Sequence, residues 1–218
     1  MTVLLRDDFT GSGTLSGRTP DGVHGGTWAN DPYWWGGDIA TSTSIAGGIL
    51  TSATVSAAWS GCIPLAGSPS DGYIEAGIVQ SALDTSCDAY LALRVNTSTG
   101  AGVYCLFNAA SATTVMVNLH RNGTPSTGVG SSGTYTVANA LNFVARLEVS
   151  GLTASVYLNG TLVLAYTLTA NTGGGLAEIQ IDGASTHPLS FDYIEAGDLT
   201  APVVPIFWTS FVGSHEVP

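Results

Sequence analysis

Apolar and polar residues alternate between positions 141 and 170, and this pattern predicts three consecutive antiparallel strands. Apolar side chains fall at every second position of the first strand, which is the period of a strand that buries one face. A two-residue turn at Ser150-Gly151 would set Val149 opposite Leu152 and continue the apolar face into the second strand. The dipeptide Asn159-Gly160 predicts the next hairpin, because a type I′ turn needs positive φ at both central residues.

The third strand of this region is expected over residues 161–168. Carrying the register across the second turn pairs Tyr157 with Leu162 and Val156 with Val163. That pairing places leucines on the face that carries polar residues in the two preceding strands. Either a β-bulge resets the register there, or this face is covered by another part of the protein.

The rest of the chain repeats short alternating segments between Gly-rich turns, and no stretch shows the 3.6-residue period of a helix. We therefore predict an all-β protein, an antiparallel β-sandwich. A chain of 218 residues can bury the core of one such domain. We assign residues 1–200 to the sandwich and residues 201–218 to an apolar C-terminal arm.

The balance of charges is strongly acidic, with 16 Asp and Glu against five Arg and no Lys, a net charge of −11. This balance excludes a nucleic-acid partner, because no basic patch is present to replace the counterions of a phosphate backbone. Only 10% of the residues are charged and 44% are hydrophobic, which favours a surface partly buried against copies of the chain or other subunits. No apolar run is long enough to insert into a membrane.

Three cysteines, Cys62, Cys87 and Cys105, lack the spacing of a metal site. We interpret them as small buried hydrophobic residues, with a Cys87–Cys105 disulfide as the alternative.

A cluster of aromatic and acidic residues follows position 30. Aromatic rings beside carboxylates are typical of sugar sites, because a pyranose stacks its apolar face on a ring while carboxylates bind its hydroxyls. The alternative is that the rings close one end of the sandwich. The candidate glycan-binding residues are Asp31, Tyr33, Trp34, Trp35 and Asp38.

The C-terminal segment carries more apolar side chains than an exposed tail tolerates. We expect it to dock either on a neighbouring subunit, as an assembly arm, or on its own sandwich. The residues of this arm are Ile206, Phe207, Trp208, Phe211 and Val212.

The pentapeptide Tyr-Ile-Glu-Ala-Gly occurs twice, at residues 73–77 and 193–197. Nothing on either side extends the match. We interpret the two copies as strands in matching environments of the sandwich rather than as a duplication.

Several motifs resemble the concanavalin A-like (laminin G-like) jelly-roll domains of tailed-phage virion proteins. The similarity covers roughly residues 3–199 and implies a jelly-roll sandwich. The matching segments are Asp7-Asp8-Phe9, Thr19-Pro20-Asp21, Gly26-Thr27-Trp28, Ala145 to Val149 and Val156 to Val163.

The same sandwich also hosts glucanases, in which Glu and Asp alternate on one strand so that two carboxylates face one cleft. The sequence pattern does not indicate such a run, since Asp192 and Glu195 are out of phase for one strand face. We therefore predict no catalytic residue and no enzymatic activity. The glutamates interpreted as isolated are Glu75, Glu148, Glu178 and Glu195.

The histidines, His24, His120, His187 and His215, do not cluster, so no metal and no cofactor is predicted. Calcium is the one ion that the pattern leaves open, because loop aspartates are its usual ligands. The loop aspartates are Asp31, Asp38, Asp84 and Asp88.

Together these features lead us to expect a non-enzymatic structural protein of the phage virion, most simply a tail or tail-tip subunit. Its partners would be copies of itself, other virion subunits and a host-surface glycan. The alternatives are a capsid decoration or head-fibre protein, a free carbohydrate-binding module and a divergent glycosidase whose sugar release would depend on one of these acidic residues.

Overall fold

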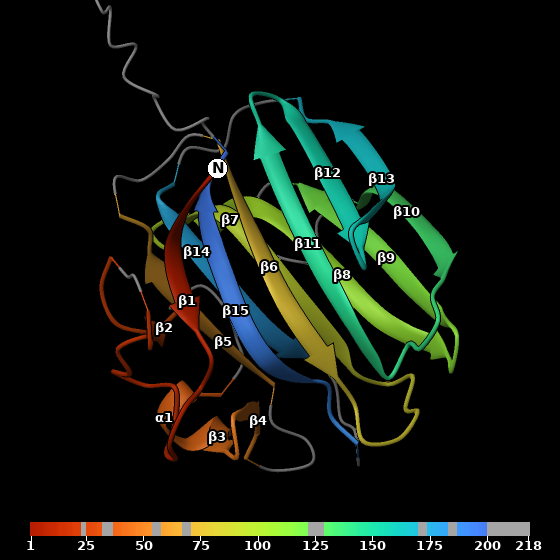
Figure 1. The fold of residues 1–218 in the computed structure, drawn as a ribbon. Helices are drawn as coiled ribbons and strands as arrows, with labels where there is room; N and C mark the ends of the chain where they lie inside the picture. The colour runs from red at the N-terminus through yellow and green to blue at the C-terminus, as the bar shows by residue number, and fades with distance from the viewer. Residues whose placement is uncertain are drawn as a thin grey trace, which may run out of the picture.

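The computed structural model describes residues 1–22, 25–31, 37–53, 58–66, 71–121, 129–169, 174–182 and 187–199. Within these residues the chain forms two antiparallel sheets packed face to face (Figure 1). The only helix among them is the short α1, Ile39–Ser42. The prediction of an all-β sandwich is confirmed.

The front sheet of Figure 1 contains eight strands among the described residues. β1 (Thr2–Asp7) pairs with β15 beside the main path of the sheet. The path runs through β13 (Thr161–Thr167), β12 (Thr153–Leu158), β11 (Asn142–Ser150), β6 (Gly72–Val79), β15 (Ser190–Asp198), β4 (Ile49–Ser52) and β3 (Thr43–Ala46).

The back sheet contains seven strands in the same described part of the chain. It places β14, which comes late in the sequence, between two early strands. The order is β10 (Val129–Thr136), β9 (Thr114–Arg121), β8 (Ala101–Ser111), β7 (Asp88–Asn96), β14 (Leu176–Asp182), β5 (Trp59–Pro64) and β2 (Ala29–Asn30).

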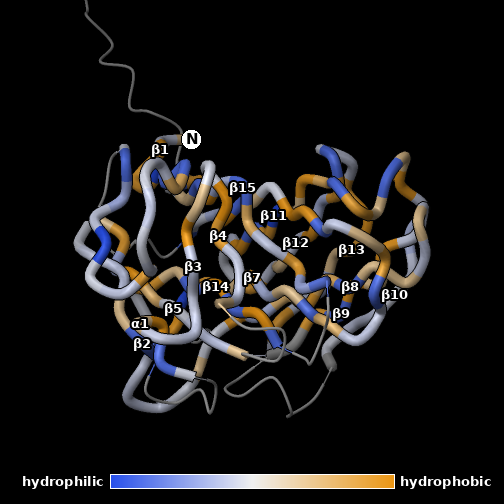
Figure 2. The backbone as a smooth tube through the Cα atoms, turned by 90° about the horizontal axis from the view of Figure 1, so that it is seen from below, coloured by the Kyte–Doolittle hydropathy of each residue, from blue (hydrophilic) through white to orange (hydrophobic). Residues whose placement is uncertain are grey.

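The core lies between the two layers, which Figure 2 shows from below. Alternate residues of each strand point inward, as the period of two requires. Aromatic rings join the sheets: Trp59 meets Phe191 edge-on at 6.0 Å between ring centroids, and Phe107 lies 6.4 Å from Phe143. All four rings are buried.

The second predicted hairpin contains a β-bulge, the first of the two alternatives considered. Tyr157 pairs with Leu162, but Val156 pairs with Leu164, so Val163 is the extra residue. The bulge returns Leu164 to the core, where it is 6% exposed, and leaves Leu162 53% exposed.

The first hairpin turns one residue later than predicted. Ser150 pairs with Thr153 and Val149 with Ala154, so the turn consists of Gly151 and Leu152. The reason is that Gly151 adopts a φ of 54°, which suits the first turn position. The partners of β11 shift by two positions, so the same side chains still face the core.

The opening motif of the chain holds the N-terminal loop in place. Asp7 is fully buried and accepts hydrogen bonds from Trp28 Nε1 at 2.9 Å and from the Arg18 guanidinium. Asp21 accepts a hydrogen bond from the Thr10 backbone at 3.0 Å. These residues of the predicted resemblance are therefore structural.

The repeated pentapeptide forms a local two-fold arrangement between β6 and β15. Glu75 and Glu195 are opposite each other, Tyr73 Oη donates to Glu195 at 2.8 Å, and Tyr193 Oη donates to Glu75 at 2.8 Å. Each ring lies over the glycine of the other copy: a Cβ at Gly77 would meet the Tyr193 ring at 2.9 Å. The interpretation as two strands in matching environments is confirmed.

The three cysteines are free and buried, as predicted, and the alternative Cys87–Cys105 disulfide is not formed. Among the described residues, no helix has the length and the apolar character that a membrane span requires.

Candidate functional site

The outward face of the back sheet carries two carboxyl groups on neighbouring strands. Asp88 at the start of β7 and Asp182 at the end of β14 are direct cross-strand partners, and both are partly exposed. Opposite residues of antiparallel strands have Cβ atoms about 4.5–5.5 Å apart. We call Asp88 and Asp182 the acidic pair.

Asn108 on β8 fixes one member of the acidic pair. Its Nδ2 donates to Asp88 Oδ1 at 2.8 Å and to the carbonyl oxygen of Cys87 at 3.0 Å. Burial raises the pKa of Asp88, and the charge of Asp182 raises it further, while the Asn108 hydrogen bond opposes this rise. Asp88 thus holds a proton more tightly than an ordinary aspartate.

A second polar group lies deeper on the same face of β14. Glu178 and Gln180 are both fully buried. Ser60 Oγ and Gln180 Nε2 each donate a hydrogen bond to Glu178 Oε1. Burial raises the pKa of Glu178 to about 8, and the charge of Asp31 adds to the rise.

The expectation that no carboxylates alternate on one strand is wrong for β14. Glu178, Gln180 and Asp182 stand at every second position, so all three point to the outward face. The run Glu-Ile-Gln-Ile-Asp in the sequence contains this signal. Asp88 could not have been found that way, because only the fold brings β7 beside β14.

The candidate glycan-binding residues separate in the structure. Asp31 is 6% exposed and close enough to Glu178 to raise its pKa. Asp38 instead caps α1, accepting a hydrogen bond from the Ala40 backbone at 2.9 Å. Tyr33, Trp34 and Trp35 lie outside the described residues, so their glycan role stays a prediction.

The predicted loop aspartates are not gathered into one group in the described part of the chain. Asp84 accepts a hydrogen bond from the Ser86 backbone at 3.0 Å, and Asp88 belongs to the acidic pair. The described residues include no group of three or more Asp, Glu, His or Cys side chains that could hold a metal ion. The arm residues Ile206, Phe207, Trp208, Phe211 and Val212 lie outside the described residues.

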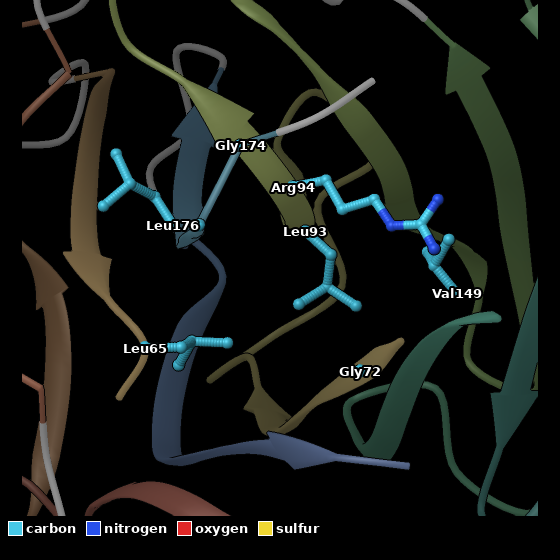
Figure 3. A pocket seen from close by; sticks show the side chains of 8 residues that line it. Leu65, Gly72, Leu93, Arg94, Val149, Gly174 and Leu176 are labelled. Carbon is cyan, nitrogen blue, oxygen red and sulfur yellow. The ribbon is translucent and has the colours of Figure 1, made fainter. Parts of the chain in front are cut away.

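A cavity at one end of the sandwich is too small for a sugar. It has a volume of about 10 Å³, which is room for about one water molecule. Figure 3 shows Arg94 at its wall, with the guanidinium extending toward Val149 and away from Leu65. That guanidinium donates to Gly151 O at 2.8 Å and pairs with Asp71 at 3.2 Å, so it links β7 to the β11–β12 turn.

A wider groove of about 410 Å³ lies over the front sheet, where β15 begins. Its described lining residues are apolar or carry amide and hydroxyl groups, and none of them is acidic or aromatic. The lining is Ala46, Ile49, Thr51, Val79, Gln80, Ser81, Pro188 and Ser190. The groove therefore lacks the paired carboxyl groups that the back sheet presents.

The outward face of the front sheet also carries glutamates, but they are paired with arginines. Arg146 binds Glu148 at 2.7 Å and Glu75 at 3.6 Å, and its guanidinium lies 3.9 Å from the centroid of the Tyr73 ring. Arg6 approaches Glu195 at 3.4 Å. Because these carboxylates are already neutralised, this face is a weaker candidate for chemistry than the back sheet.

The architecture defines the chain as a jelly-roll sandwich of the concanavalin A-like type. No family model matches the sequence, and no curated protein matches it. Solved structures do resemble the fold. The laminarinase from Rhodothermus marinus is similar with a TM-score of 0.61 at 11% identity, covering 89% of this chain and 96% of that one.

Two further solved structures resemble the fold at similarly low sequence identity. The LamAcat structure from Zobellia galactanivorans is similar with a TM-score of 0.59 at 12% identity, covering 89% of this chain and 97% of that one. The β-glucanase of Bacillus licheniformis is similar with a TM-score of 0.55 at 12% identity, covering 88% of this chain and 96% of that one. At these identities the likeness shows the fold.

These findings correct the functional expectation. The jelly-roll part of the predicted resemblance is confirmed, but the link to phage virion proteins is not supported. The similar structures include laminarinases and other glucanases, which contradicts a non-enzymatic tail, capsid or head-fibre protein and does not favour a free carbohydrate-binding module. The expectation of no enzymatic activity is contradicted on the same ground. The error arose because one jelly roll serves scaffolds, lectins and enzymes alike.

Proposed function

We propose that this chain is a carbohydrate-active enzyme that hydrolyses a β-linked glucan on the outward face of the back sheet. The observation that carries the proposal is the acidic pair, Asp88 opposite Asp182. Glycosidases act through two carboxyl groups, one protonated and one ionised. The similar solved structures support the substrate class, since their names describe enzymes of β-1,3- and β-1,3-1,4-glucans.

The two members of the acidic pair take different roles in this proposal. Asp88 has the raised pKa and is the proton donor to the glycosidic oxygen. Asp182 is the nucleophile that bonds to the anomeric carbon as the glycosidic bond breaks. A water molecule then cleaves the glycosyl ester, giving its proton back to Asp88 and its oxygen to the sugar.

The spacing of the pair predicts the stereochemistry of the reaction. Retaining enzymes hold their carboxyl groups about 5–5.5 Å apart, and inverting enzymes about 6.5–9.5 Å apart. Directly opposite positions on paired strands suit the shorter distance. We therefore expect the anomeric configuration to be retained.

The test is release of reducing ends from laminarin and lichenan by the full chain and by two variants, Asp88→Asn and Asp182→Asn. Each variant should lose about 10³-fold or more of the wild-type rate. Asp192→Asn is the matched control, because Asp192 is exposed on β15 of the other sheet and should leave the rate unchanged.

Proton NMR of the first sugar released shows which anomer forms. Three results would overturn the proposal: no hydrolysis of either glucan, variants as active as the wild type, or glucan binding without any cleavage. An inverted product would overturn the assignment of Asp182 as nucleophile.

A further inference from the structure

Two buried oxygen atoms on β14 lack a hydrogen-bond partner among the described residues. They are Glu178 Oε2 and Gln180 Oε1, on side chains that are both fully buried. Buried polar atoms are nearly always paired, and leaving one unpaired costs about 1–3 kcal/mol. Two neighbouring acceptors without a donor therefore call for an explanation.

The remaining polar atoms of these two side chains are already hydrogen-bonded to each other. Gln180 Nε2 donates to Glu178 Oε1, so the amide and the carboxyl group lie side by side. The two residues are separated by one position and share a face of the strand. The unpaired atoms are the second oxygen of the carboxyl group and the oxygen of the amide, the two atoms that a ring of two hydrogen bonds would join.

We propose that Glu178 is held as the neutral acid, with its proton on Oε2 donated to Gln180 Oε1, and that loss of this proton switches off the face that carries the acidic pair. The proton converts one of the two acceptors into a donor. Both orphaned atoms are then paired without a ligand, a metal or a water molecule. An ionised Glu178 would leave a full charge buried beside an amide oxygen, which is the costly arrangement.

Burial and a nearby negative charge favour the neutral form of Glu178, while hydrogen bonds from Ser60, Gln180 and Tyr104 oppose the rise of its pKa. Its cross-strand partners are Cys62 on β5 and the apolar Ala92 on β7. The hydroxyl of Tyr104 on β8 also approaches the carboxyl group, and it donates to Gly100 O at 3.4 Å. Asp31 adds a negative charge nearby.

Proton loss has two consequences for this face. It breaks one of the two hydrogen bonds that hold Gln180, and it adds a negative charge near Asp31 and on the same strand face as Asp182. Substrate binding should therefore weaken as the pH rises through about 8, the pKa of Glu178. The effect on substrate binding is the functional half of the proposal and rests on the proposed function, whereas the protonation of Glu178 does not.

The linkage to stability has a definite sign. The pKa of Glu178 rises from 4.5 to about 8 on folding, so between these values the folded chain keeps a proton that the unfolded chain releases. Its stabilising contribution is complete below pH 4.5 and is lost as the pH rises to about 8. In that window one proton changes the unfolding equilibrium constant about tenfold per pH unit.

The first test is urea unfolding of the full chain from pH 6 to pH 9.5, wild type against Glu178→Gln. A glutamine at 178 closes the same ring as an amide pair, so this variant should fold and should lack the one-proton slope below about pH 8. Glu148→Gln, on the other sheet, is the matched control and should keep the slope. Equal slopes in wild type and Glu178→Gln would overturn the proposal.

The second test is infrared spectroscopy, which needs neither substrate nor unfolding. Folded wild type at pH 7 should show the C=O stretch of a buried protonated carboxyl group, and this band should disappear by pH 9.5. The band should remain in Asp88→Asn and be absent from Glu178→Gln. Its absence from the wild type at pH 7 would mean that Glu178 is ionised and would end the proposal.

The third test uses the glucan assay to examine the functional half. Glu178→Gln should keep its KM for the glucan above pH 8, where the KM of the wild type rises, and an identical alkaline rise of KM in both would contradict the switch. If neither glucan is cleaved at any pH, the proposed function fails, and the infrared band still decides whether Glu178 is protonated.

Discussion

The carboxyl groups on the two outward faces of the sandwich have opposite kinds of partners. On the front sheet one row of residues crosses five neighbouring strands in register, from Tyr157 through Arg146, Glu75 and Glu195 to Arg6. Its carboxylates meet guanidinium or phenol donors. On the back sheet Asp88 faces another aspartate, and the buried Glu178 accepts hydrogen bonds from the neutral side chains of Ser60 and Gln180.

This difference separates a stabilising network from a candidate functional site. Paired charges lower the free energy of the folded state and need no further partner. Like charges held together, or a buried carboxyl group with a raised pKa, cost stability, and such groups concentrate where a protein carries out chemistry. We therefore expect substitutions to have opposite effects on the two faces.

The largest effect should come from Arg146, which is the more buried of the two cations of the front row. Arg146→Met removes its ion pairs with Glu75 and Glu148 and its contact with the Tyr73 ring. The side chain is 16% exposed, so we expect a loss of about 2 kcal/mol in the free energy of unfolding. Urea unfolding measures it. Arg6→Met is the control, since Arg6 is 35% exposed and should lose about half as much.

An intermediate effect should come from the two tyrosines of the repeated pentapeptide. Tyr73→Phe and Tyr193→Phe each remove one hydrogen bond to a carboxylate of the opposite strand, and each should lower stability by about 1 kcal/mol. Because their surroundings match, the two losses should agree to within about 0.5 kcal/mol. A large effect of one variant and none of the other would show that the local two-fold arrangement is not energetically symmetric.

The smallest effects give the sharpest comparison, because the change in the free energy of unfolding should have opposite signs on the two faces. Asp182→Asn removes the repulsion of Asp88 and should raise the free energy of unfolding by about 0.5 kcal/mol at pH 7. Glu195→Gln weakens the pairing with Arg6 and Tyr73 and should lower it by a similar amount. Equal signs in chemical denaturation would remove the distinction drawn between the faces.

The sequence by itself determined the class of fold and most of the late strands. The alternation over residues 141–170 and the dipeptide Asn159-Gly160 are local signals, because side-chain period and turn geometry depend on neighbouring residues. The pentapeptide repeat was likewise interpreted correctly from its two copies. The turn at Gly151 was misplaced by one residue, since either Ser150-Gly151 or Gly151-Leu152 keeps the apolar face continuous.

The site was only partly accessible to the same reasoning. Glu178, Gln180 and Asp182 alternate within one strand, so their common face could have been predicted from the run itself. Asp88 could not, because it meets Asp182 only where the sheet order inserts β14 between β7 and β5. Pairing between strands so distant in sequence depends on the packing of the whole sandwich. That packing also buries Glu178 and raises its pKa, so the tertiary structure alone decided which carboxyl groups became the candidate site.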